Sequence, residues 1–387
     1  MINLLEEELS ELKAKDLYRK LRILEKPAGN YASYEGRKLL LFCGNDYLGL
    51  SKHPRVIRAA QEAAGSHGVG AGAARLISGT TDLHSRLEEK IAASKKKERA
   101  LLFTAGYLAN LGILTALASE KDLILMDKLC HASIIDGARL SGAEVRVFPH
   151  KNYERCEDIL KKSEHRRRIL VSDTVFSMDG DVADLPALVR LKEKYDCLLC
   201  VDDAHGTGVL GKTGKGAAED LGLENKIDVI MGTFSKGLGC LGGFAATSET
   251  IYNYLINFAR PFIFATALPP LLCAAAFEAL CIIEEEPGLL KKLWANIYQL
   301  QQLLGEMGYS VVADSPILPI GIGPEKEALR LSDLLLKEGI LIPAVRTPTV
   351  PKGKARLRVT LSAAHTSDEI SRLGKSLKEA LKSAKSI

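Results

Sequence analysis

Side chains able to carry out covalent and proton-transfer chemistry stand just after several short apolar runs of the sequence. A lysine can attack a carbonyl carbon, a carboxylate can hold a cationic ring, and an imidazole can move a proton. Because the carboxyl ends of parallel strands meet at one edge of a sheet, we expect these side chains to share a site if the runs are strands. In chain order they are His131, Ser177, Asp202, His205, Thr233 and Lys236.

Lys236 stands in a loop rich in hydroxyls and glycines. It lies between Thr233 and Ser235 on one side and Gly237 and Gly239 on the other. Glycines permit the close approach of a bound group, and a lysine in such a loop can form a Schiff base with the aldehyde of pyridoxal phosphate (PLP). This cofactor also needs an anion beside its ring nitrogen and donors for its phosphate. The loop therefore predicts a PLP site.

Two neighbouring carboxylates, Asp202 and Asp203, follow the apolar run 198–201. Neighbouring side chains of a strand point to opposite faces, so only one of them can meet the ring nitrogen. We expect Asp202 to hold that nitrogen protonated, which makes the ring an electron sink. For the phosphate we expect the backbone N–H groups of residues 104–110, where a strand passes into a helix.

The stretch 206–213 offers an alternative interpretation. Its sequence GTGVLGKT matches the GxxxxGK[ST] pattern of nucleotide hydrolases. A phosphate-binding loop of that kind follows its strand directly and opens a helix. Here four residues separate the apolar run from Gly206, and Gly214 and Gly216 stand where the helix should begin. This context favours the PLP site.

Between about residues 98 and 245, short β-rich runs alternate with helical segments, which predicts an α/β domain around a largely parallel sheet. The expected strands are 100–103, 123–126, 145–148, 169–171, 198–201 and 229–231. The expected helices are 107–118, 133–140, 153–162 and 185–195.

The ends of the chain differ from this central pattern. The first 45 residues are typical of a helix and a small strand pair at 31–42, and the composition changes near 284–288. We therefore expect an N-terminal segment 1–45 attached to the main body, a large domain 46–287 and a C-terminal domain 288–387. In the apolar stretch 261–283, the pair Pro269-Pro270 would break a membrane-spanning helix. A strand or turn followed by a buried helix is expected there.

Composition and charge favour a globular, cytoplasmic protein. Of 387 residues, 47% are hydrophobic and 26% are charged, with a net charge of +4. This charge is too small to make nucleic acid or a membrane the expected partner, and the runs 95–97 and 166–168 are typical of solvated helix ends. The acidic N-terminus does not resemble a secretory signal. The eight cysteines indicate buried thiols in a reducing compartment, and no metal site is expected.

Over nearly its whole length the chain resembles the α-oxoamine synthases, a family of fold type I PLP enzymes. The motifs that carry this resemblance are NDYLGL (45–50), ISGT (77–80), HAS (131–133), FSMDG (176–180), VDDAHGTG (201–208), TFSKG (233–237), PTVP (348–351) and ARLR (355–358). The resemblance implies an aspartate-aminotransferase-like fold, with a large domain around a mostly parallel sheet and a smaller α/β C-terminal domain. It also implies a homodimer with sites at the subunit interface.

The resemblance assigns roles around the cofactor. Lys236 would carry PLP and remove the Cα proton of the amino acid, Asp202 would pair with the ring nitrogen, and His205 would pair with the ring oxygen. His131 would stack on the ring face. The other residues implied around ring and phosphate are Gly106, Tyr107, Ser177, Thr233 and, from the neighbouring subunit, Thr266.

The resemblance also implies residues for the substrates. Arg358 would clamp the carboxylate of the amino acid, and Arg19 and Thr349 would face the acyl substrate. Asn45 would also be a substrate-binding residue. Arg356 and Arg358 share a face of the expected strand 356–361, so periodicity does not choose between them. The resemblance selects Arg358.

The implied reaction is a decarboxylative condensation of an amino acid with an acyl thioester, which releases CoA and CO₂. The motif at 45–50 and the tail at 356–365 are most similar to members that join L-alanine to pimeloyl-CoA, or to pimeloyl carrier protein, in biotin synthesis. Glycine C-acetyltransferase and 5-aminolevulinate synthase share most of the motifs, so alanine or glycine and the acyl chain stay open. A non-catalytic subunit on this scaffold would lack the lysine, and Lys236 is present.

Overall fold

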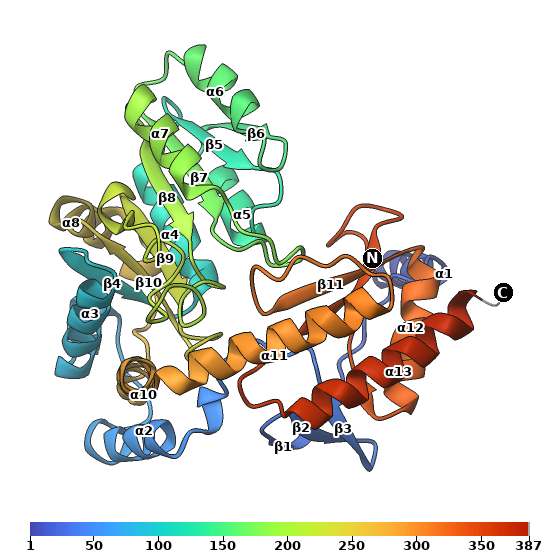
Figure 1. Cartoon of the computed structure of the whole chain (residues 1–387). Helices are drawn as coiled ribbons and strands as arrows, with labels where there is room; N and C mark the ends of the chain where they lie inside the picture. Colours follow the sequence, from blue (N-terminus) through green and yellow to red (C-terminus); the bar gives the residue numbers. More distant parts are fainter. Residues whose placement is uncertain (386–387) are drawn as a thin grey trace. The chain divides into compact units, whose positions relative to one another are not determined.

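The computed structural model describes residues 1–385, which divide into two compact units (Figure 1). The large unit contains residues 45–177 and 181–292. The second unit contains residues 1–44, 178–180 and the chain from Leu293 onward. The N-terminal segment therefore belongs with the C-terminal part of the chain, whereas the sequence suggested that it attaches to the large domain.

A seven-stranded sheet forms the centre of the large unit. Its strands are β4 (Arg99–Phe103), β5 (Leu123–Asp127), β6 (Glu144–Phe148), β7 (Arg168–Asp173), β8 (Leu198–Asp202), β9 (Val229–Thr233) and β10 (Gly243–Thr247). They lie in the order β4-β10-β9-β8-β7-β5-β6. Only β10 runs antiparallel to its neighbours β4 and β9; the other neighbouring strands pair in parallel. The six expected strands are confirmed, and β10 is an addition.

Helices cover the sheet because its parallel strands are apolar on both faces. All five residues of β5 are buried, for example. Helix α4 (Gly106–Leu117) packs against β9 and β10 of the sheet and also against α5 (Ala132–Leu140). Its Ala109 and Ile113 share a core with Met231 of β9. This packing fixes the first turn of α4 beside the carboxyl end of β9.

The remaining helices of the large unit surround this core. They are the 3₁₀-helix η1 (Leu50–Lys52), α2 (Pro54–His67), the π-helix η2 (Arg75–Gly79), α3 (Asp82–Ser94), α6 (Tyr153–Lys161), α7 (Leu185–Tyr195), the 3₁₀-helix η3 (Glu224–Lys226), α8 (Glu249–Phe258), α9 (Arg260–Ile263) and α10 (Pro270–Glu285). The expected helices at 107–118, 133–140, 153–162 and 185–195 correspond to α4, α5, α6 and α7.

The apolar stretch 261–283 differs in part from its prediction. Its second half is the buried helix α10, as expected, which begins with Pro270 in its first turn. Its first half contains the short helix α9 instead of a strand or turn. Pro261 lies in the first turn of α9, where a missing N–H removes no hydrogen bond from the helix.

The second unit contains two smaller sheets. The first has the order β1 (Glu25–Ala28), β2 (Tyr31–Tyr34), β3 (Arg37–Leu41) and β12 (Ile340–Leu341), with β12 parallel to β3. This pairing joins the N-terminal segment to the C-terminal one. The second has the order β11 (Ile317–Gly323), β14 (Ala355–Thr360) and β13 (Ala344–Val345). The helices with residues in this unit are α1 (Ile2–Ala14), α11 (Pro287–Glu306), α12 (Glu325–Lys337) and α13 (Ser367–Lys385).

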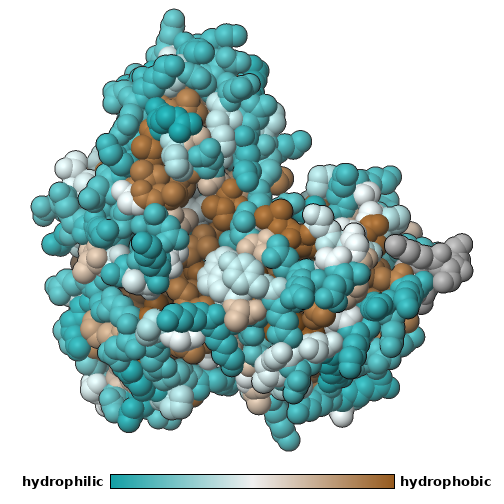
Figure 2. Space-filling view, viewed as in Figure 1, coloured by the Kyte–Doolittle hydropathy of each residue, from teal (hydrophilic) through white to brown (hydrophobic). Residues whose placement is uncertain are grey.

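Hydrophilic residues cover most of the face shown in Figure 2, and hydrophobic residues gather in patches over the large unit. Large apolar side chains that the large unit exposes include Leu140, Val147, Phe258 and Phe264. Within residues 1–385, the helices are all too short or too polar to cross a lipid bilayer.

Candidate active site

A cavity of about 170 Å³ lies at the carboxyl edge of the large sheet. Of the sequence-predicted residues, it brings together Gly106, Tyr107, His131, Asp202, His205, Thr233 and Lys236. Asp173 at the end of β7 and Ser133 in α5 also line it, and sequence reasoning gave neither a role. An amine, two imidazoles and two carboxyl groups therefore share one small space.

Asp202 is held in a fixed position in this cavity. Its Oδ2 accepts a hydrogen bond of 2.7 Å from the Nδ2 of Asn110, and its Oδ1 accepts one of 2.9 Å from the backbone N–H of Ala204. The same Asn110 amide lies 2.9 Å from the hydroxyl of Ser133, which in turn lies 2.7 Å from Nδ1 of His131. This chain of hydrogen bonds aligns the carboxylate and the imidazole with each other.

Two titratable neighbours of Asp202, the base His131 and the acid Asp173, are both biased toward their neutral forms. Burial, and then the positive charge of Lys236, lower the pKa of His131, although Asp202 acts in the opposite direction. Burial, and then the negative charge of Asp202, raise the pKa of Asp173 well above its usual range. Asp173 also accepts a 2.9 Å hydrogen bond from the backbone N–H of His131. A neutral imidazole beside the cavity suits contact with the face of an aromatic ring.

His205 is oriented by a tyrosine from a distant part of the sequence. The hydroxyl of Tyr47, a fully buried side chain, lies 2.7 Å from Nδ1 of His205. The same hydroxyl lies 3.3 Å from Oδ1 of Asn45. The motif at residues 45–50 therefore supports His205, and Asn45 reaches the site through Tyr47. The sequence pattern singled out this motif but gave Tyr47 no role.

The first turn of α4 and the loop of Lys236 approach each other closely. A Cβ atom on Gly106 would lie 3.2 Å from the Cβ of Thr233, so glycine allows this contact without displacement. The hydroxyl of Thr233 donates to the carbonyl of Gly242 at 2.6 Å, which fixes the loop. Ala105, which precedes α4, provides no side-chain cap, so the N-terminal N–H groups of the helix have no side-chain acceptor there.

These groups fit PLP. The cavity contains a lysine for the aldehyde, a fixed carboxylate for the ring nitrogen and an uncapped helix N-terminus for the phosphate. The chemistry of this donor set, and not any single residue, makes the fit.

Asp203 lies in the protein interior. Its Oδ2 pairs with Nζ of Lys95 at 2.9 Å, and its Oδ1 accepts a 2.8 Å hydrogen bond from the hydroxyl of Thr174. The expectation that the run 95–97 is solvated is therefore wrong for Lys95, whose side chain is only 3% exposed. Lys95 directly follows α3, and its side chain points into the interior, where it pairs with Asp203.

The alternative nucleotide-binding loop does not form. Residues 206–215 consist of turns and bends, and no helix begins directly after Thr213. Lys212 is exposed. Without a helix N-terminus after the lysine, this stretch lacks the group that binds phosphate in such loops.

Two predicted cofactor residues are not among those lining the cavity. Ser177 lies in the turn after β7, directly after the buried Phe176. Thr266 is exposed and forms an isolated β-bridge with Ala74. An exposed Thr266 is compatible with the predicted role in a neighbouring subunit.

The second unit contains the predicted acyl-side residues. Arg19 and Thr349 line one cavity of about 830 Å³, together with the further cations Lys13, Lys20, Arg22 and Arg346. Arg358 is buried in β14. Burial raises the pKa of the Cys43 thiol to about 11, and the positive charges of Arg358 and Arg22 act to lower it. Arg356, two residues earlier, pairs with Asp179 at 2.5 Å.

Residues 37–377 match the family described as aminotransferase class I and II. The chain belongs to this family. Over 368 residues it is 47% identical to the 8-amino-7-oxononanoate synthase of Citrifermentans bemidjiense, with 94% of each chain covered.

Solved structures give the same result for the fold. The chain matches serine palmitoyltransferase from S. paucimobilis with a bound PLP–myriocin aldimine at a TM-score of 0.94 and 29% identity, over 99% of this chain and 98% of that one. It matches 8-amino-7-oxononanoate synthase from Francisella tularensis at a TM-score of 0.78 and 31% identity, over 89% and 98%. The chain therefore has the fold of type I PLP transferases and is a PLP-dependent enzyme.

Proposed function

We propose that this enzyme condenses L-alanine with a pimeloyl thioester, either pimeloyl-CoA or pimeloyl carrier protein, to give 8-amino-7-oxononanoate, CO₂ and the free thiol. This is a step of biotin synthesis. The observation that carries the proposal is the single cavity that joins Lys236 with Asp202, His131 and His205. The 47% identity to an 8-amino-7-oxononanoate synthase supports this choice of substrates.

In this proposal the large unit holds the cofactor. Asp202 pairs with the ring nitrogen, His205 with the ring oxygen, and His131 lies against the ring face. Gly106 and Tyr107 at the start of α4 receive the phosphate, where N–H groups and the helix dipole favour an anion. Ser177 and Thr233 of the same chain lie around the ring and phosphate, and Thr266 of the partner subunit completes the phosphate site. Bound PLP supplies an electron sink for negative charge at Cα of the amino acid.

The protein's own groups then bind the amino acid and move the proton. Arg358 grips the carboxylate of L-alanine with two parallel hydrogen bonds, which sets the direction of the Cα–H bond. Nζ of Lys236 takes the Cα proton and later returns a proton to the product. Asp202, held through both oxygens, keeps a proton on the ring nitrogen throughout. His131 covers the ring face and excludes water from it.

On the acyl side we propose that the cavity of Arg19 and Thr349 binds the thioester substrate. Its guanidinium groups on Arg19, Arg22 and Arg346 suit phosphate oxygens, which CoA and the prosthetic arm of a carrier protein both carry. One methylene changes binding by only about 1–3 kcal/mol, so chain length is best established by assay.

The test is a panel of amino acids and thioesters with the full-length enzyme and added PLP. L-Alanine, glycine and L-serine are each combined with pimeloyl-, acetyl-, succinyl- and palmitoyl-CoA, and thiol release and product mass are measured. The proposal predicts the fastest release with L-alanine and pimeloyl-CoA, or with pimeloyl carrier protein in a parallel assay. Faster release with glycine and acetyl-CoA would instead identify a glycine C-acetyltransferase. Lys236→Ala is the control without activity.

A further inference from the structure

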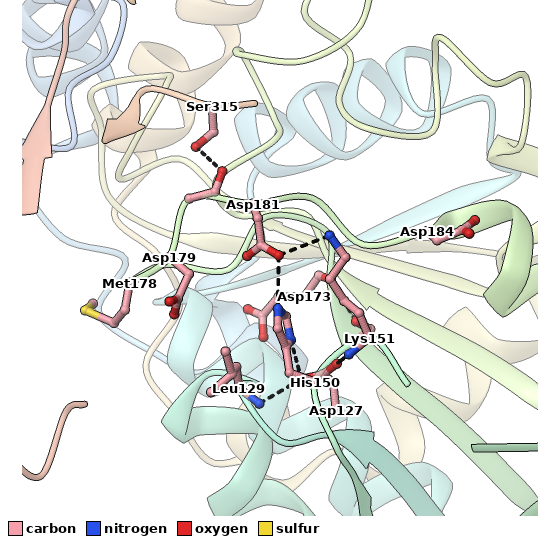
Figure 3. Close-up of polar contacts among 12 residues, drawn as sticks. Asp127, Leu129, His150, Lys151, Asp173, Met178, Asp179, Asp181, Asp184 and Ser315 are labelled. Carbon is pink, nitrogen blue, oxygen red and sulfur yellow. Dashed lines mark hydrogen bonds and ion pairs between the residues drawn. The ribbon is translucent and has the colours of Figure 1, made fainter. Parts of the chain in front are cut away.

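A histidine outside the cofactor cavity joins two carboxylates at the same edge of the sheet. His150 stands two residues after the end of β6, and Figure 3 shows its ring between Asp127 and Asp181. Its Nδ1 lies 3.0 Å from Oδ1 of Asp127, and its Nε2 lies 3.0 Å from Oδ2 of Asp181. Both ring nitrogens are therefore used.

The Asp127 side of this bridge shapes the turn that leads to His131. Asp127 is the last residue of β5. Its Oδ1 also accepts a 2.8 Å hydrogen bond from the N–H of Leu129, and its carbonyl accepts one of 3.2 Å from the N–H of Cys130. Because His131 is the next residue, the position of the Asp127 carboxylate helps to fix where that imidazole enters the cavity.

The Asp181 side of the bridge fixes the segment that carries Ser177. After β7 the chain reverses at residues 174–183, where N–H of Phe176 donates to the carbonyl of Asp181 at 3.0 Å. The His150 ring also meets the ring of Phe176 edge-on, with centroids 4.4 Å apart. Ser177 directly follows Phe176, so His150 contacts the segment on both sides of this serine.

The charges make the bridge strong. Burial alone would lower the pKa of His150, but its hydrogen bonds to Asp127 and Asp181 outweigh burial and raise the pKa to about 9. Lys151 adds a second cation, 3.1 Å from the same Oδ2 of Asp181. Within residues 1–385, Oδ1 of Asp181 is buried without a hydrogen-bond partner, so this carboxylate depends on His150 and Lys151. Other titratable groups that interact electrostatically with these carboxylates or with each other include Tyr153, Asp173, Asp184, Cys130 and Cys156.

We propose that His150 is a positioning residue for the cofactor site, because it ties the segment of Ser177 to the turn of His131. This inference rests on the cofactor roles proposed above for those two residues. The imidazolium form makes both ion pairs. The bridge is therefore complete at neutral pH. It weakens as His150 gives up its proton, because a neutral imidazole keeps only one N–H donor for the two carboxylates, and this loosens the segments of Ser177 and His131 together.

The test compares His150→Gln with a matched control, His165→Gln. His165 also bridges a serine and a carboxylate, Ser163 and Glu144, and its side chain is 25% exposed against 26% for His150. It pairs with the first residue of β6, at the opposite end of the strand. The two readouts on the full chain are amide hydrogen exchange at 128–131 and 174–183 before PLP is added, and the dissociation constant of PLP between about pH 7 and about pH 10.

We expect His150→Gln to exchange faster in both segments and to bind PLP about tenfold more weakly at pH 7, because a charge-assisted bridge is lost. The parent and His165→Gln should weaken toward this level as pH rises through about 9, while His150→Gln lacks that step. Parent-like exchange and binding in His150→Gln would overturn the proposal. If every protein fails to bind PLP, the proposed function fails, and the exchange readout still tests the tie. If His150→Gln does not fold, Asp181→Asn breaks the same bridge and must give the same result.

Discussion

Nζ of Lys95 and Oδ2 of Asp203 lie 2.9 Å apart in the interior of the large unit, and each side chain is only 3% exposed. Nζ of Lys95 also donates to the hydroxyl of Thr207 at 2.8 Å. Asp202, the preceding residue, instead faces the cavity. The end of β8 thus directs one carboxylate to a proposed catalytic role and its neighbour to a structural one.

This division predicts opposite consequences for the two carboxylates. Asp203→Asn leaves Lys95 buried without its anion, which should lower the free energy of unfolding by about 3–5 kcal/mol. Asp202→Asn should leave stability nearly unchanged and lower turnover by about 100-fold, because the ring nitrogen loses its anion. Urea unfolding and steady-state rates measure the two effects. The assignment would be contradicted if Asp203→Asn lowered turnover as much as Asp202→Asn does and did not lower the free energy of unfolding.

Tyr47→Phe tests the support of His205. Removing the hydroxyl takes this partner from Nδ1 of the buried His205 imidazole, which should lower the free energy of unfolding by about 1–3 kcal/mol. Because His205 is then less well oriented, PLP binding or turnover should weaken about tenfold. Tyr195→Phe is a suitable control, since its hydroxyl bonds to Glu157 instead of a cavity residue. A Tyr47→Phe enzyme as active as this control would show that His205 does not need the tyrosine.

His84 should make the large unit sensitive to acid. Burial, and then the charge of Arg75, lower its pKa to about 4, and its Nε2 bonds to the carbonyl of Leu268 at 2.8 Å. A lowered pKa contributes stability that is complete above the usual pKa of about 6.5 and is lost as pH falls toward 4. The loss should reach about 3 kcal/mol. Urea midpoints of the parent and of His84→Asn should differ less at pH 5 than at pH 7; an unchanged difference would refute this.

Arg358 and Arg356 should respond differently to replacement by lysine. Arg358→Lys loses the two-pronged grip on a carboxylate and should raise the KM for alanine about tenfold while leaving the PLP absorbance intact. Arg356 pairs with Asp179, and lysine can keep this ion pair, so Arg356→Lys should change the KM little. An unchanged alanine KM in Arg358→Lys would place the carboxylate elsewhere.

The sequence predicted the strands of the large sheet well because they are continuous apolar runs. The prediction missed β10, because its sequence GFAAT contains only one large apolar residue. This segment is a strand because it pairs with both β4 and β9. The prediction also placed a strand or turn where the short helix α9 lies. Local patterns cannot reveal a strand that depends on its neighbours.

The cavity residues were predictable because the carboxyl ends of parallel strands meet at one edge. The residues that orient them were not, because those contacts join distant parts of the chain. Tyr47 is 158 positions from His205, Asn110 is 92 from Asp202, and Lys95 is 108 from Asp203. Asn110 did leave a signal, as a polar residue in the apolar helix sequence GYLANLGILTAL.

The most direct measurement is the site at which PLP becomes attached to the chain. The full-length enzyme is loaded with PLP, reduced with borohydride, digested and analysed by mass spectrometry, with Lys236→Ala treated in parallel. We predict a phosphopyridoxyl group on the peptide containing Lys236, and no such group at this position or at another lysine in the variant. Attachment at a different lysine in the parent, or none after loading, would contradict the assignment of this cavity as the active site.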